Sequence, residues 1–157
     1  MESVLDQLRR HSVAYFSLFI AISGLAYNTW RNEKTEEQRS VRHAAFVVLE
    51  NLGDMQEIVD TRYYFLPFSE DMSSEPQLRL RGFGSALMSR DLMNLLPPPA
   101  PAAGQELHAL WVKQFLKLDQ LTDDGEHSQA ARTAEEQLRE AIGRARDAVL
   151  QVLENLD

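Results

Sequence analysis

The sequence predicts an all-α protein in which a single N-terminal transmembrane helix is followed by an antiparallel bundle of about four helices. Three observations predict this class. Residues 11–30 are uncharged over the length of a bilayer-spanning helix. Apolar residues then recur at helical spacing, and no two strand-like runs are available to pair. We therefore expect a short tail at 1–10, an anchor at 11–30 and a bundle domain at 31–157.

The predicted anchor, HSVAYFSLFIAISGLAYNTW, lies between the arginines at positions 10 and 31. Its length is about the 20 residues that cross a bilayer as a helix. Serine, asparagine and threonine side chains lower its hydrophobicity and weaken insertion. Tyr27 and Trp30 suit the aromatic belt at a membrane interface. The lipid bilayer is therefore the first partner that the sequence predicts.

Small and polar residues recur in the anchor at steps of three and four, which places them on one side of its helix. The set is Ala14, Ser17, Ala21, Gly24 and Asn28. Small residues let helices approach closely in lipid, and an asparagine amide can bond across the contact. The set predicts a helix-association face, used by a homo-oligomer or a protein partner. The alternative is a chance alignment of residues that are ordinary in membrane helices.

Residues 1–26 also resemble the three regions of a cleaved signal peptide. Against cleavage, apolar and aromatic residues continue to Trp30, and no turn signal opens a mature domain. Basic residues flank the anchor on both sides, and their number slightly favours a cytoplasmic C-terminal domain. The chain contains no cysteine, which fits either compartment.

The 157 residues leave room for one modest domain beyond the anchor. A net charge of -8 disfavours nucleic acid as a partner, because phosphate binding needs a dominant basic face. The proline-alanine run and the short basic tail suggest a bacterial inner membrane protein.

The first bundle helix is predicted over 31–66 and should end at Pro67. Its apolar stripe alternates steps of four and three: Val41, Ala45, Val48, Leu52, Met55 and Val59. A second helix is predicted over 76–96, with Ser74 as N-cap. Its inward face should hold Leu80, Phe83, Leu87, Leu92 and Leu95 or Leu96. Gly82 and Gly84 weaken this helix prediction.

The run PPPAPAAG at 97–104 predicts a stiff spacer between antiparallel helices. The alternative is a docking site for an aromatic-lined groove. A third helix is predicted over 105–121, with inward residues Leu107, Leu110, Trp111, Leu118 and Leu121. The last is predicted over 128–157, capped by Ser128. Its stripe is Ala134, Leu138, Ile142, Ala145, Val149, Val152 and Leu156.

No residue pattern predicts catalysis, so we expect no enzyme, cofactor or metal site. The four histidines are scattered, and none has a glutamate three residues before it, as a dimetal bundle requires. Asp124 and His127 have that spacing but lie in a glycine-containing loop, which favours a polar turn. No glycine-rich phosphate loop follows a strand.

Aromatic residues gather where the first bundle helix should end. The predicted partner or ligand patch is Arg62, Tyr63, Tyr64, Phe65 and Phe68. The alternative is that these residues cap the bundle core. Two functions follow: a non-enzymatic, membrane-anchored interaction or scaffold subunit, or an extracytoplasmic sensor that binds a small ligand at this patch.

Overall fold

The part of the protein that the computed structural model describes, residues 12–69 and 74–156, is mostly helical. Within these ranges 86% of residues are helical and no strand forms. The main helices are α2 (Ser12–Asp60), α3 (Glu75–Met93), α4 (Ala100–Gln114) and α5 (Gln129–Glu154). A π-helical turn, η1 (Thr61–Phe65), and two 3-10 turns, η2 (Leu66–Phe68) and η4 (Phe115–Lys117), follow α2 and α4. The predicted all-α class is confirmed.

The chain divides into two compact units, Met1–Ser40 and Val41–Asp157. Helix α2 contributes residues 12–40 to the first unit and 41–60 to the second. The predicted anchor and the first predicted bundle helix therefore belong to one helix from Ser12 onward. The predicted tail at 1–10 lies outside the described residues.

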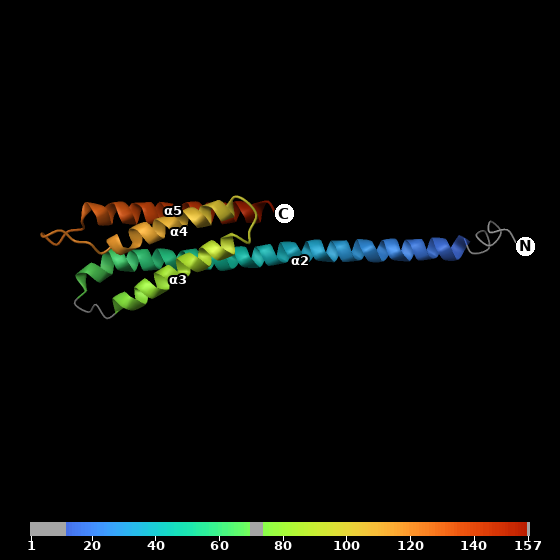
Figure 1. The fold of residues 1–157 in the computed structure, drawn as a ribbon, viewed down its shortest axis with the longest axis horizontal. Coiled ribbons are helices and arrows are strands. Elements are labelled where there is room, and N and C mark those ends of the chain that lie inside the picture. The colour runs from blue at the N-terminus through green and yellow to red at the C-terminus, as the bar shows by residue number, and fades with distance from the viewer. Residues whose placement is uncertain (1–11, 70–73, 157) are drawn as a thin grey trace, which may run out of the picture. The chain divides into compact units, whose positions relative to one another are not determined.

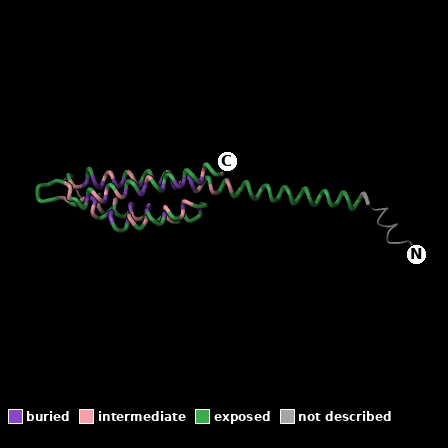
Figure 2. The backbone as a smooth tube through the Cα atoms, turned by 90° about the horizontal axis from the view of Figure 1, so that it is seen from above, coloured by how far each residue is buried: buried purple, intermediate pink, exposed green. Residues whose placement is uncertain are grey.

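The second unit is a bundle in which α3, α4 and α5 lie along the C-terminal part of α2 (Figure 1). The predicted stripe of α2 forms its core, since Ala45, Val48, Leu52, Met55 and Val59 are fully buried and Val41 packs against them. The predicted stripe of α5 is also buried as far as Val152, and Leu156 is half-buried. Figure 2 shows these buried positions as purple segments on the bundle helices.

Polar contacts fix the ends and crossings of these helices. Ser128 caps α5 as predicted, because its hydroxyl oxygen accepts from the Ala131 amide at 3.1 Å. Asn51 on α2 donates from Nδ2 to the Ser85 carbonyl at 2.8 Å and to Ser89 Oγ at 2.7 Å on α3. This buried amide therefore sets the register between α2 and α3, since another alignment would leave it without partners.

The predicted inward face of α3 is partly wrong. Phe83 and Leu92 are half-buried against the core and Leu96 is buried, but other predicted members are exposed. Leu80, Leu87 and Leu95 are 78%, 45% and 72% exposed. The buried positions are instead Gly82, Ala86, Ser89 and Met93. Close packing accounts for the glycine at position 82, since a Cβ there would lie 2.8 Å from Phe115 Cζ in η4 and 3.1 Å from Trp111 Cζ2 in α4.

The proline run is only partly a spacer, which corrects the boundary of the third helix. Helix α4 begins at Ala100, inside the run, with proline in its first turn, where a missing amide hydrogen costs nothing. Gly104 then packs against α3, since a Cβ there would lie 2.9 Å from Met93 Cβ. The third helix is therefore α4 with η4, ending at Lys117 rather than at 121. The predicted core residue Trp111 is fully buried.

Within residues 12–69 and 74–156, no helix combines the length and apolar character needed to cross a bilayer. The spanning anchor expected at 11–30 is thus not found there, although the segment is helical from Ser12. Polar side chains such as Ser17, Ser23 and Asn28 interrupt its apolar surface.

Candidate functional site

Bulky apolar side chains cover most of the circumference of α2 between residues 14 and 30, and small or polar residues occupy the remaining side. These side chains are all 56–70% exposed: Tyr15, Phe16, Leu18, Phe19, Ile20, Ile22, Leu25, Tyr27 and Trp30. Figure 2 shows this part of α2 in green along its whole described length. We call residues 14–30 the apolar segment.

The predicted association residues Ala14, Ser17, Ala21, Gly24 and Asn28 all lie on the apolar segment and are exposed. Their spacing on one continuous helix places them along one side. A Cβ built on Gly24 would meet no atom within 4 Å, so this side is open to a neighbour. Their role in association stays a prediction.

The apolar segment ends in a small aromatic and charged group. The Tyr27 and Trp30 rings lie 6.2 Å apart, and Lys34 Nζ lies 5.8 Å from the Trp30 ring centroid. Glu33 and Glu37 line the same surface hollow as Trp30 and Lys34. An aromatic ring beside an ammonium group at the end of an apolar helix is the arrangement found at membrane interfaces.

Arg62, the charged member of the second predicted patch, is only 3% exposed. It donates from Nη1 to Glu75 Oε1 at 3.1 Å and from Nη2 to Asp119 Oδ2 at 2.7 Å. Its guanidinium carbon lies 4.8 Å from the Phe115 ring centroid. Arg62 therefore joins η1 to the start of α3 and to the turn after η4, and its charged end is engaged inside the chain.

The aromatic members of this patch divide between packing and exposure. The Tyr63 ring stacks on His127 with centroids 3.9 Å apart, and Phe68 meets the same imidazole edge-on at 5.5 Å. Burial raises the pKa of Tyr63 above its ordinary value of 10.0, and Glu135 and Tyr64 raise it further. Tyr64, Phe65 and Phe68 are 48%, 69% and 60% exposed. The structure thus combines core capping, by Arg62 and Tyr63, with an exposed aromatic edge.

Tyr64 is held from α5 by an arginine. Arg139 Nη2 lies 3.5 Å from Tyr64 Oη and 3.5 Å from Asp60 Oδ1, and it also pairs with Glu135. The same side chain therefore connects α5 to the end of α2. A partner or ligand role for this patch stays a prediction.

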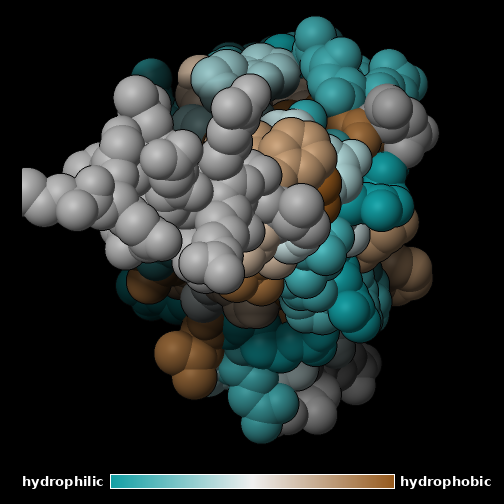
Figure 3. Space-filling view, turned by 90° about the vertical axis from the view of Figure 1, so that its right-hand side faces the viewer, coloured by the Kyte–Doolittle hydropathy of each residue, from teal (hydrophilic) through white to brown (hydrophobic). Residues whose placement is uncertain are grey.

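Sequence reasoning missed a surface groove on the outer side of α3. A hollow of about 530 Å³ is lined by Gly84, Leu87, Met88, Asp91, Leu92 and Leu95. Hydrophobic residues, in brown, lie among hydrophilic ones, in teal, on the face that Figure 3 shows. The leucines that line this groove are visible in the sequence, but their helical spacing predicts a core face.

The described residues contain no group of three or more histidine, cysteine or acidic side chains placed to hold a metal ion. Searches against protein-family models, curated proteins and solved structures return no match for this chain. Function must therefore be argued from these surfaces.

Proposed function

We propose that this protein is a non-enzymatic, membrane-bound helical protein that recruits or stabilises other proteins. The observation that carries the proposal is the apolar segment, whose nine large side chains are all more than half exposed on α2. Leaving so much apolar surface in water is unfavourable by about 25 cal/mol per Å², so lipid or protein must cover it. Lipid is favoured because the bulky side chains cover most of the circumference of the helix, which is wider than the single stripe of a bundle helix.

The dimensions and flanks of the apolar segment support lipid contact. Residues 14–30 extend about 25 Å as an α-helix, close to the ~30 Å of a hydrocarbon core. The Tyr27, Trp30 and Lys34 group would lie at the headgroup level. Beyond it, the sequence RNEKTEEQR is charged and exposed, as expected for a helix that has left the lipid. The bacterial inner membrane remains the predicted location.

The interaction role is argued from what the second unit exposes. Phe46, Phe65 and Phe68 are 60–69% exposed, and α3 adds a leucine-rich outer face. Aromatic side chains of this kind are typical anchors of protein interfaces. The sensor alternative rested on a ligand at Arg62 to Phe68, and no observation favours it, since Arg62 already binds Glu75 and Asp119.

Membrane binding is tested by a charge placed in the apolar segment of the full-length protein. Phe19→Glu should move the protein from the membrane fraction to the supernatant after an alkaline wash, because a carboxylate is costly in lipid. The matched control is Phe46→Glu, which changes a phenylalanine of similar exposure, 62% against 68%, in the second unit. Equal retention of both variants, or a wild-type protein in the supernatant, would refute membrane binding through this segment.

The side of the membrane is tested with a single cysteine in the exposed loop before α5. Asp124→Cys should react with a membrane-impermeant maleimide only after lysis if the second unit is cytoplasmic. Labelling in intact cells would place that unit outside and revive the sensor hypothesis. The intact mass of the purified protein tests the cleavage of residues 1–26 in the same preparation.

A further inference from the structure

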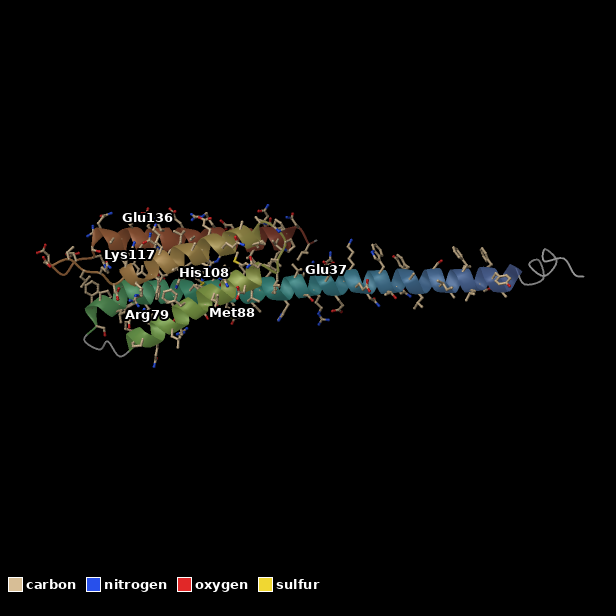
Figure 4. The ribbon with its side chains drawn as sticks, viewed as in Figure 1. Glu37, Arg79, Met88, His108, Lys117 and Glu136 are labelled. Atoms are coloured by element: carbon tan, nitrogen blue, oxygen red, sulfur yellow. The ribbon has the colours of Figure 1, made fainter. Side chains whose placement is uncertain are left out.

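Helix α3 is apolar on two opposite sides, and only one of them packs in the bundle. Its outer side exposes Leu80, Leu87 and Met88 by 78%, 45% and 48%, and Leu95, in the turn just after α3, is 72% exposed. Together with Gly84 and Asp91 these residues form what we call the outer stripe of α3. Met88 and Arg79, labelled in Figure 4, both belong to this helix.

The spacing of the residues in the outer stripe is the same in both chain directions. Its positions are 80, 84, 87, 88, 91 and 95, so the steps are four, three, one, three and four. Turning a second α3 end over end about the midpoint of Leu87 and Met88 places leucine 80 opposite leucine 95. The same rotation places Leu87 opposite Met88 and Gly84 opposite Asp91. A surface that matches itself after a half-turn is what a twofold interface requires.

Charges next to the stripe match in the same way. Arg81 is exposed and lies one turn before Gly84. In the antiparallel arrangement it comes beside Asp91 of a second copy. Asp91 already accepts two bonds from its neighbour Arg90, at 3.0 and 2.7 Å, and a carboxylate has room for about two more. Each copy would contribute one such pair.

Glycine at position 84 supplies the space for this contact. A Cβ built there would meet no atom within 4 Å, and the groove of about 530 Å³ runs from Gly84 to Leu95. The facing carboxylate can therefore approach the helix backbone without a clash. The glycine that weakened the helix prediction thus lies where the second copy comes closest.

We propose that the outer stripe of α3 pairs antiparallel with the same stripe of a second copy of this chain. The pairing uses residues of the second unit only and does not depend on membrane binding. The four exposed apolar side chains amount to on the order of 400 Å² per copy, about half of what a stable dimer buries. We therefore expect weak pairing in dilute solution and stronger pairing where copies are concentrated on one surface.

The test uses single cysteines, because the chain has none of its own. Full-length Leu80→Cys and Leu95→Cys proteins are prepared separately, mixed in detergent micelles and oxidised with copper phenanthroline. The antiparallel arrangement predicts a mixed disulfide between positions 80 and 95, at least about fivefold more abundant than either self-linked dimer. Val112→Cys, on α4 and 55% exposed, is the matched control for random collision.

Charge reversal gives a second and independent readout in the same mixture. Arg81→Asp should lower the mixed disulfide about threefold or more, and adding Asp91→Arg to both chains should restore it. Circular dichroism and the unfolding midpoint of each variant show whether the bundle is intact. Self-linking of position 80 above the mixed product, or a mixed product no greater than that of the Val112→Cys control, would overturn the proposal.

Discussion

Arg62 donates from Nη2 to Asp119 Oδ2 over 2.7 Å and thereby joins the end of the first helix to the turn after η4. A second bond, 3.1 Å to Glu75 Oε1, brings in the start of α3. The arginine side chain is 4% exposed and lies over the Phe115 ring. One buried cation therefore holds three segments together, in addition to the apolar contacts of the core.

Removing this cation should destabilise the bundle far more than removing a surface one. Arg62→Met keeps the apolar stem but leaves Glu75 and Asp119 unpaired. Because these carboxylates are 24% and 20% exposed, we expect a loss of about 2–4 kcal/mol in the free energy of unfolding, below the buried-pair maximum. The control Arg144→Met breaks the exposed 2.8 Å pair with Glu106 and should cost under about 1 kcal/mol. Urea unfolding measures both, and equal losses would contradict a structural role for Arg62.

Two glycines on α3 should respond to alanine in opposite directions. At Gly82 a new Cβ would lie 2.8 Å from Phe115 Cζ, and Phe115 cannot move freely because it is fully buried and stacked on Trp111 at 4.8 Å. Gly82→Ala should therefore cost about 1–3 kcal/mol despite better helix propensity. Gly84→Ala meets nothing and should stabilise by about 0.5–1 kcal/mol. Thermal unfolding of both variants tests these two predictions. Stabilisation by both substitutions would refute the close contact between Gly82 and Phe115.

The sequence identified α2 and α5 because each has one apolar side. In both helices the stripe read from the spacing became the core, from Ala45 to Val59 and from Ala134 to Val152. Helix α3 was predicted only in part, since Gly82, Ala86 and Ser89 are buried while Leu80 and Leu87 are exposed. Residue size alone does not tell which apolar side is buried when helices approach closely.

The site could be predicted only where its partners are near in sequence. Tyr63, Tyr64 and Phe68 were recognised as a cluster because they are neighbours along the chain. The partners that bury Arg62 lie 13 and 57 residues away, and the His127 ring that stacks on Tyr63 comes from a distant loop. Such contacts depend on how the helices pack against one another in three dimensions, and the spacing of apolar residues does not determine that packing.

The raised pKa of Tyr63 predicts that stability falls at alkaline pH. Above pH 10.0 the tyrosine of the unfolded chain loses its proton, while the folded chain keeps it because burial raises the pKa. The folded state then binds more protons, so the free energy of unfolding decreases as pH rises through this window and is unaffected below it. Tyr63→Phe should reduce that decrease, whereas Tyr27→Phe, at an exposed tyrosine of the first unit, should not. Urea unfolding at about pH 8 and pH 11 measures the loss of unfolding free energy between the two pH values. An equal loss in both variants would show that Tyr63 is not its cause.

The association face on the apolar segment makes the remaining prediction. Gly24→Leu places a bulky side chain among Ser17, Ala21 and Asn28 and should prevent close approach of two helices. Ala26→Leu adds a similar volume about 200° away around the helix and is the matched control. Energy transfer between labelled full-length chains in vesicles measures pairing. Both variants also carry Leu87→Gln, which weakens pairing through the outer stripe of α3. We expect Gly24→Leu to weaken pairing about tenfold, near 1.4 kcal/mol, with little change for Ala26→Leu. Equal effects would show that the small residues do not form a specific face.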